Sequence, residues 1–504
     1  MKKIVFFAAT LTCAAGLFAS GVENKTNMST GYLRNPSRNT ENERPEAAFY
    51  NIAGTAFLDD GLYFEAGDQI VLKEYSNELD TGNAFASYGV NDYYSNDETT
   101  VFLYPDFDAV YKNDRWAFFL TFGVYAGGGS LSYSEGTSAT SLMFLNGASQ
   151  FGDEAVKYGL AANMIASASK AWADAVANKF GGSQEIALAW IQANPDNADA
   201  QQLQQAYGVV QKYGANAADY LAKKNTYEAA AGASLKMAQK HSLDVTSMTL
   251  GGQLGASYLV FPWLSVSAAY RYTYGTQNMK LQCLAPEFAA VNGGDEISYD
   301  ARGFGQSMVF GVHAKLPQVE GLDLSVQYQT LSRIDYDVDN VKGSIAALYN
   351  ITDDSKFRTD LPAVLNLGVG YKVIDPLYLS ASFNYYFNDF AHQDSILSET
   401  DYDNSWEIAL GADWRICKYA GLSAGCSYGV QGSNDNSNST FNPVLDAFVA
   451  GGGLEIYPTE DFTITLAGLY AKYYDKDYYL GNNKTVLSKK VTNLSAGITY
   501  KLPL

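Results

Sequence analysis

The sequence predicts an all-β transmembrane protein, an antiparallel outer-membrane barrel of about fourteen strands. Apolar and polar residues alternate regularly after residue 240, and short turns alternate with long polar loops along the chain. After the N-terminus, no apolar run reaches the roughly twenty residues of a membrane helix. Apolar residues make up 47% of the chain and aromatic residues 14%. A soluble secreted β-protein has a similar composition, but the rhythm of the loops favours a barrel in a membrane.

The first twenty residues read as a secretory signal peptide. A basic start, Met1 to Lys3, precedes the apolar run IVFFAATLTCAAGLFA, and small residues end the segment at Ala19 and Ser20. This run is too short and wrongly flanked for a membrane anchor. We therefore expect residues 1–20 to be removed on export.

Strict alternation predicts strands with one lipid-facing and one lumen-facing side. In SWEIALGADWRI (405–416), one face carries mainly large apolar residues from Trp406 to Ile416, and the other carries Glu407, Asp413 and Arg415. The C-terminal stretch LSAGITYKLPL alternates in the same way. The fourteen expected strands are residues 61–75, 99–112, 115–132, 247–261, 263–279, 302–316, 322–335, 362–374, 376–390, 404–417, 420–432, 446–458, 462–475 and 489–504.

Turn lengths predict which end of the barrel faces outward. Short turns such as Asn113-Asp114 and Asp375-Pro376 suit the periplasmic end. Long polar loops such as SILSETDYDN and GSNDNSNSTFN suit the outer end, where we expect them to keep the surface solvated.

Residues 150–240 interrupt this pattern and predict a helical insertion. The segment is rich in Ala and Gln, and apolar residues recur at helical spacing. By strand polarity the insertion is extracellular. Its apolar side chains either pack on one another or line a groove that captures a ligand. The candidates for ligand contact are Leu160, Met164, Trp172 and Trp190.

The segment before the first strand, NMSTGYLRNPSRNTENERPEAAFYNIAGTAFLDDG, resembles the start of the FadL/TodX family of outer-membrane transporters for long-chain fatty acids and other hydrophobic compounds. The resemblance implies a hatch or plug, residues 21–60, inside a barrel of residues 61–504. The family's hatch motif corresponds to Asn51, Ile52, Ala53 and Gly54. Ile52 stands where the family has proline, which fixes the backbone angle φ.

Three consecutive glycines, Gly127, Gly128 and Gly129, lie in the third expected strand. Such a run weakens pairing and permits a bulge or a kink. The family resemblance implies a lateral opening at this kink, through which an apolar ligand leaves into the membrane. Alternatively, the glycines merely end the strand at the outer interface.

Arg271 is the candidate partner for a ligand carboxylate. Alternation places it inward, between outward Tyr270 and Tyr272, and a guanidinium grips a carboxylate with two parallel hydrogen bonds. The alternative is an ion pair between Arg271 and a lumen acid such as Glu407 or Asp413.

Other classes of function find little support in the sequence. There are three His residues and no Cys/His spacing typical of a metal site, so we expect neither an enzyme nor a metal or other cofactor. A net charge of −20 argues against a nucleic-acid partner. We expect a monomer that contacts membrane lipid and lipopolysaccharide and passively takes up hydrophobic small molecules. One alternative is a structural or adhesive barrel whose helical cap binds an external partner. Another is a diffusion porin, which a hatch that fills the lumen disfavours.

Overall fold

The computed structural model describes residues 27–83, 85–86, 92–396, 402–434 and 437–503. The expected signal peptide and the first residues of the expected hatch lie outside these ranges. The chain divides into two compact units. One is Leu142–Gln239, and the other comprises the described parts of Thr12–Ser141 and Lys240–Leu504.

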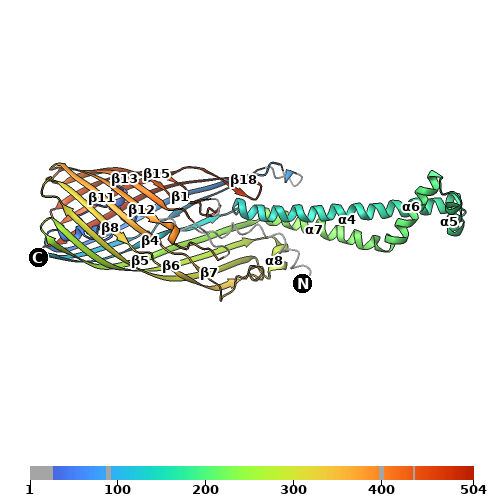
Figure 1. The fold of residues 1–504 in the computed structure, drawn as a ribbon, viewed down its shortest axis with the longest axis horizontal. Coiled ribbons are helices and arrows are strands. Elements are labelled where there is room, and N and C mark those ends of the chain that lie inside the picture. Colours follow the sequence, from blue (N-terminus) through green and yellow to red (C-terminus); the bar gives the residue numbers. More distant parts are fainter. Residues whose placement is uncertain (1–26, 84, 87–91, 397–401, 435–436, 504) are drawn as a thin grey trace. The chain divides into compact units, whose positions relative to one another are not determined.

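The second unit is built on one antiparallel sheet (Figure 1). Its strands are β1 (Gly61–Asp80), β2 (Asp92–Val101), β3 (Asp106–Asn113), β4 (Trp116–Tyr133), β5 (His241–Phe261), β6 (Leu264–Cys283), β7 (Glu296–Lys315), β8 (Leu322–Gln329), β9 (Asp335–Lys342), β10 (Lys356–Arg358), β11 (Ala363–Ile374), β12 (Leu377–Phe387), β13 (Ser405–Cys417), β14 (Ala420–Val430), β15 (Ala447–Thr459), β16 (Phe462–Tyr473), β17 (Lys476–Leu480) and β18 (Asn483–Leu502).

These segments form a closed barrel of fourteen strands, which confirms the predicted fold class. Four barrel strands consist of two segments each: β2 with β3 against β1, β8 with β9 against β7, β10 with β11 against β9 and β8, and β16 with β17 against β18. The last strand, β18, pairs with β1 from Leu62↔Leu502 to Asp80↔Lys484. This pairing leaves no open edge.

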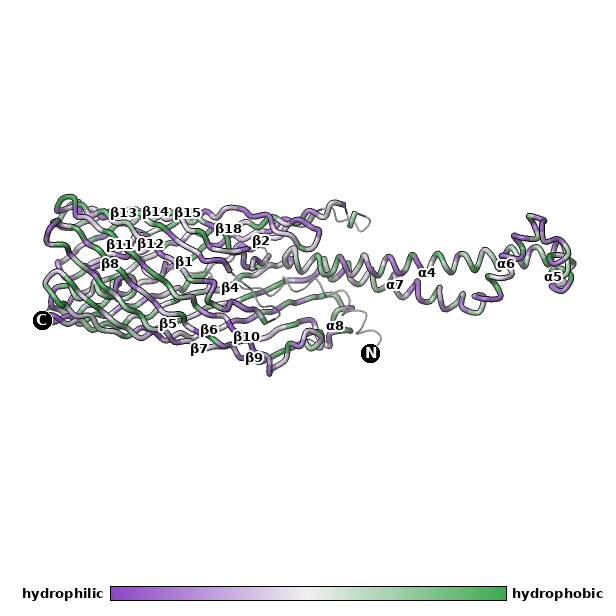
Figure 2. Tube along the Cα trace, viewed as in Figure 1, coloured by the Kyte–Doolittle hydropathy of each residue, from purple (hydrophilic) through white to green (hydrophobic). Residues whose placement is uncertain are grey.

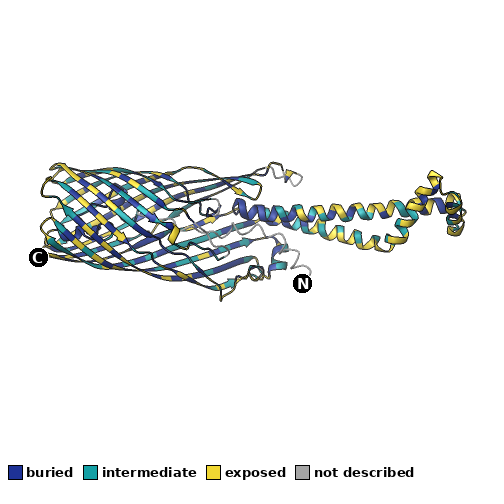
Figure 3. Cartoon of the chain, in the orientation of Figure 1, coloured by how far each residue is buried: buried dark blue, intermediate teal, exposed yellow. Residues whose placement is uncertain are grey.

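Side chains alternate between the lumen and the outside, as predicted. On β13, Ile408, Leu410 and Trp414 are about half exposed, whereas Ala409 between them is buried. The tube and the burial colouring show this alternation along the barrel strands (Figures 2 and 3). Exposed apolar side chains on a barrel wall suit contact with lipid.

The polar loop between β14 and β15 differs from the expectation. We expected GSNDNSNSTFN to be a solvated surface loop, but Asn438, Ser439 and Thr440 are buried. Asn77 on β1 donates to the carbonyl of Thr440 (2.9 Å) and the Tyr133 hydroxyl donates to the carbonyl of Phe441 (2.9 Å). The loop is rich in Asn and Ser because its folded-in backbone needs polar partners.

The hatch precedes β1 and contains three short helical segments: α2 (Thr30–Arg34), α3 (Ala47–Tyr50) and the 3-10 helix η2 (Gly54–Phe57). Ser29 caps α2 by accepting from the backbone of Tyr32 (3.1 Å). Small residues allow the hatch to pack tightly. A Cβ on Gly31, for example, would overlap the carboxylate of Glu46.

The first unit is helical. Its helices are α4 (Ser138–Lys179), which begins in the second unit, α5 (Gln184–Ala193), α6 (Ala198–Tyr213), the 3-10 helix η4 (Gly214–Asn216) and α7 (Ala217–Gln239). The helical segment starts at Ser138 rather than near residue 150. Within the described ranges, none of the helices is both long and apolar enough to cross a bilayer. The remaining short helices, α8 (Pro286–Asn292), η5 (Ala346–Tyr349) and η6 (Asn388–Phe390), belong to barrel loops.

Candidate functional site

Arg271 lies on β6, points into the lumen and is 3% exposed. Its guanidinium lies between two aromatic rings, 5.0 Å from the ring centre of Phe49 and 4.5 Å from that of Tyr125. Nε donates to Gln253 Oε1 (2.9 Å), and Nη1 donates to Gln329 Oε1. These contacts hold the group in place with neutral partners and two cation–π interactions.

The expected alternative, an ion pair between Arg271 and Glu407 or Asp413, is wrong. Among the described residues, no carboxylate forms an ion pair with Arg271. Asp413 instead pairs with Arg34, and Glu407 accepts from the hydroxyl of Tyr32 (3.2 Å). The guanidinium charge is therefore buried without an acid beside it, which costs free energy unless an anion binds.

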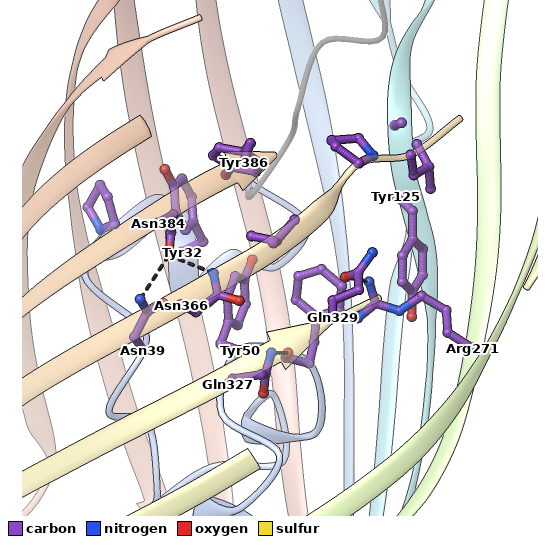
Figure 4. A pocket seen from close by; sticks show the side chains of 16 residues that line it. Tyr32, Asn39, Tyr50, Tyr125, Arg271, Gln327, Gln329, Asn366, Asn384 and Tyr386 are labelled. Atoms are coloured by element: carbon purple, nitrogen blue, oxygen red, sulfur yellow. Dashed lines mark hydrogen bonds between the residues drawn. The ribbon is translucent and has the colours of Figure 1, made fainter. Parts of the chain in front are cut away.

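A cavity with about 700 Å³ of empty space, part of it open to solvent, lies next to Arg271 (Figure 4). Phe49 and Tyr50 of the hatch line it together with wall residues from several strands. On one side, Asn384 Oδ1 accepts from Asn39 (2.8 Å) and Asn366 (2.6 Å). The cavity therefore combines aromatic walls, neutral amides and one buried cation. The full lining is Tyr32, Pro36, Asn39, Phe49, Tyr50, Tyr125, Ala126, Arg271, Gln327, Gln329, Leu361, Pro362, Val364, Asn366, Asn384 and Tyr386.

Ion pairs fasten the hatch to the barrel wall. Arg34 pairs with Asp413 on β13 and with Glu455 on β15 (3.3 Å), and Arg44 also pairs with Glu455. Burial lowers the pKa of the Arg34 guanidinium, but Glu455 and Asp413 raise that pKa by more, so the group stays charged. Within the hatch, Arg38 pairs with Glu46 (2.5 Å).

The residues aligned with the family's hatch motif contact the wall directly. The Nδ2 group of Asn51 lies 2.7 Å from His313 Nδ1, and the backbone N–H of Ile52 donates to Gln327 Oε1 (2.9 Å). The carbonyl of Ala53 accepts from Ser265 (2.6 Å). The Ile52 side chain is fully buried in a cluster with Ala48, Leu58, Tyr63, Val110, Ala117, Phe119, Ala269 and Val309.

Proline at position 52 would have no N–H to donate to Gln327 Oε1. A Cβ on Gly54 would overlap the carbonyl of Glu41, so this position requires glycine.

The three glycines on β4 lie where its pairing with β5 is irregular. The register shifts between Val124 and Ala126 and again between Ala126 and Gly129. Gly127 (φ +85°) and Gly129 (φ +77°) adopt left-handed conformations, which favour glycine. A Cβ on Gly127 would also overlap the backbone of Ser247. The glycines lie within the strand, which continues to Tyr133.

The neighbouring barrel strand is broken at the same place. The β3–β4 ladder ends at Phe107↔Phe122, and in the described part of the chain no ladder pair joins β2 to β4. Residues 102–105 separate β2 from β3, and Phe102 and Leu103 are 72% and 70% exposed. Asp68 holds this segment by accepting from the backbone N–H of Tyr104 (2.8 Å). The backbone ladder of the wall is therefore interrupted between β2/β3 and β4, where the side chain of Asp97 on β2 accepts from the backbone N–H of Ser132 on β4 (2.9 Å).

A second cavity reaches this interruption. It holds about 760 Å³ of empty space, part of it open to solvent. Gly128, Tyr104 and Lys73 line it, as do apolar residues such as Val449. Tyr32 lines both cavities, so the two spaces adjoin at this hatch residue.

The candidate residues of the helical unit fall into two groups. Trp172 is buried in the core of the unit beside Tyr207, and Trp190 packs against this core beside Phe180. Leu160 and Met164 are 67% and 51% exposed on α4. Trp172 and Trp190 thus pack within the helical unit. Of the four candidates, only Leu160 and Met164 are exposed to a ligand.

Comparison with known proteins gives a consistent result for the fold. No family model and no curated protein matches the sequence. A solved structure of a Pseudomonas aeruginosa FadL homologue matches with a TM-score of 0.59 and 14% identity, covering 95% of this chain and 99% of that chain.

Two toluene transporters also match this fold. TodX of P. putida has a TM-score of 0.53 and 13% identity, covering 92% of this chain and 96% of its own. TbuX of Ralstonia pickettii has a TM-score of 0.50 and 12% identity, covering 96% and 99%. The resemblance seen in the hatch sequence is confirmed at the level of structure, and the chain has the fold of the FadL/TodX transporters.

Proposed function

We propose that this protein is an outer-membrane transporter for the passive uptake of hydrophobic compounds. Two adjoining cavities carry the proposal. The first lies in the lumen and is walled by aromatic side chains of the hatch and the barrel, and the second meets it at Tyr32 and reaches the interruption of the wall. The fold is that of a FadL homologue and of two toluene transporters, which supports this function. Exposed apolar side chains around the barrel support a location in the outer membrane of a Gram-negative cell.

Arg271 favours an amphipathic anion, such as a long-chain fatty acid, as cargo. A buried cation without an acidic neighbour is stabilised by a bound carboxylate, and the aromatic wall of the cavity suits an alkyl chain. Toluene and other neutral compounds need no such cation. We therefore assign Arg271 the role of anchor for the carboxylate.

The proposed route starts with capture at Leu160 and Met164 on the helical insertion and continues to the Arg271 cavity. A rearrangement of the hatch then admits the cargo to the second cavity, and the cargo exits laterally at the glycines of β4. The hatch is held by ion pairs and by contacts of the motif residues from Asn51 to Gly54. We therefore propose a local movement around Tyr32, which separates the cavities, rather than expulsion of the whole hatch.

A second candidate function is adhesion through the helical unit. The exposed side chains of Leu160 and Met164 favour it, because apolar groups on a helix surface suit a protein partner as well as a lipid. Adhesion makes no use of the Arg271 cavity, so a ligand-binding measurement separates the two functions.

The test is equilibrium binding of oleate and of toluene to the purified full-length protein in detergent. Wild type is compared with Arg271→Ala and with the control Arg302→Ala, an exposed arginine on β7. We expect saturable oleate binding, weakened about tenfold or more in Arg271→Ala because a charged hydrogen bond is lost. Toluene binding should not change.

Equal oleate binding by Arg271→Ala and wild type would reject the anchor but keep the transporter. Failure of both probes to bind any of the three proteins would favour adhesion.

A further inference from the structure

Lys73 joins the two sides of the wall interruption. It lies on β1, points into the lumen and is 3% exposed. Its ammonium donates to the carbonyl of Gly128 (3.0 Å) and to that of Ser130, both on β4. The barrel strand formed by β2 and β3 lies between β1 and β4. The lysine therefore reaches past an interrupted strand to hold the next one.

The two carbonyls belong to the part of β4 where regular pairing fails. The ladder between β4 and β3 ends at Phe122. The pairing of β4 with β5 changes register twice between Val124 and Gly129. Hydrogen bonds from an ammonium are stronger than those between neutral backbone groups. Lys73 thus replaces part of the missing ladder and keeps β4 in its closed position.

We propose that Lys73 is a latch that an anionic head group releases. A carboxylate entering the second cavity competes with the carbonyls of Gly128 and Ser130 for the ammonium. Because a full negative charge attracts the ammonium more strongly than a carbonyl dipole does, the lysine turns toward the cargo and β4 is freed. The inference rests on the proposed lateral exit, and it identifies amphipathic anions as the cargo that opens the wall.

The second cavity has the chemistry that this step requires. Lys73 is one of its lining residues, and Val71, Val449 and Leu469 offer apolar surface for a chain. The lining carboxylate, Glu407, accepts from the hydroxyl of Tyr32. An anionic head group in this cavity is attracted to Lys73, so it is directed toward the interruption of the wall.

The test is hydrogen exchange of backbone amides in residues 126–131, measured by mass spectrometry on the purified full-length protein in detergent. Samples contain oleate, oleyl alcohol or neither. In the wild type, oleate should speed exchange roughly tenfold, the size expected when a hydrogen bond to a charged group is lost. Oleyl alcohol, which has the same chain without the charge, should not.

Two variants and one control test the role of the lysine. Lys73→Met should show fast exchange without any ligand. Lys73→Gln keeps a neutral donor, so its wall should stay closed and not respond to oleate. Lys112→Met changes another buried lysine, which hydrogen-bonds to Asp60 (3.2 Å) rather than to β4, and it should behave as wild type.

The proposal is overturned if oleate and oleyl alcohol act alike on the wild type, or if oleate speeds exchange equally in Lys73→Gln. Oleate binding is measured on the same samples. Oleate that binds without speeding exchange rejects the latch alone. Absence of oleate binding rejects the fatty-acid cargo on which the latch depends.

Discussion

Arg34 of the hatch and Glu455 of β15 form a buried ion pair, with 3.3 Å between Nε and Oε1. Arg34 also pairs with Asp413 on β13, and Arg44 pairs with Glu455, so two barrel strands share the hatch arginines. Buried ion pairs add little net stability, but removal of one partner leaves an uncompensated charge. The hatch is therefore fixed in one position on the wall.

The first prediction concerns Arg34→Met, which should destabilise the hatch by about 3 kcal/mol. This value is at the low end for a broken buried ion pair, because Arg38 still faces Asp413 and Arg44 still faces Glu455. Hydrogen exchange over residues 29–57 measures the local effect. The exposed Arg302→Met is the matched control and should exchange as wild type. Unchanged protection of residues 29–57 in Arg34→Met would show that the ion pairs do not hold the hatch.

The second prediction concerns Ile52→Pro, which installs the residue typical of the family's motif. Here the backbone N–H of Ile52 donates to Gln327, and proline has no N–H. The substitution leaves the Gln327 acceptor unpaired in a buried position, and we expect a loss of about 1–3 kcal/mol in the free energy of unfolding. Urea unfolding of the protein in lipid vesicles measures the change.

Two further variants separate the hydrogen bond from packing. Ile52→Val keeps the N–H and should cost about 1 kcal/mol as a core truncation. Gln327→Leu keeps the Ile52 side chain but unpairs both the N–H of Ile52 and the carbonyl of Phe49, to which Gln327 donates (3.1 Å), so it should cost at least as much as Ile52→Pro. A proline variant as stable as wild type would mean that the hatch accepts the family's residue without this contact.

The barrel was predictable because alternation is a local property. On β13, the order of apolar and polar residues alone places Leu410 outward and Ala409 inward, and the structure agrees. The hatch arginines were not predictable, because Arg34 meets Asp413 across 379 residues of sequence. The interleaved Arg, Asn and Glu residues of LRNPSRNTENERPE were the available signal of an ion-pair network.

The second expected strand, residues 99–112, is broken between β2 and β3, and the alternation of residues does not indicate this break. Its apolar residues continue through Phe102 and Leu103, but Pro105 has no N–H for the ladder, and the N–H of Tyr104 donates to Asp68.

The sequence pattern also placed the start of α4 too late, because the helix begins before its apolar residues become periodic. Thr137 caps the helix through the backbone of Thr140 (3.4 Å), ahead of the apolar periodicity that predicted a helix from about residue 150.

The third prediction concerns the loop between β14 and β15, which Asn77 holds. The Asn77 side chain donates to the carbonyl of Thr440 and accepts from the backbone N–H of Ser138 (2.6 Å). Asn77→Ala leaves these buried groups unpaired, at a cost of about 1–3 kcal/mol. We expect faster proteolysis of residues 433–446. The exposed Asn96→Ala is the control, and equal rates for the two variants would refute the role of Asn77.

The fourth prediction concerns Gly127→Ala on β4. The residue has a positive φ, and a Cβ would overlap the backbone of Ser247, so alanine does not fit the observed conformation. We expect β4 to lose its bulge and pair more regularly with β5. Under the proposed lateral exit, oleate uptake by Gram-negative cells that produce the variant should fall, whereas oleate binding to the purified protein should persist.

The control for Gly127→Ala is Gly252→Ala on β5. There a Cβ would meet only the carbonyl of Thr121, at 3.8 Å, so the backbone can stay as it is and uptake should match wild type. Comparable amounts of folded barrel in the outer membrane are required for both variants, checked by heat-dependent migration on gels. If Gly127→Ala takes up oleate at the wild-type rate while hydrogen exchange shows that the bulge is gone, the cargo does not leave through this part of the wall.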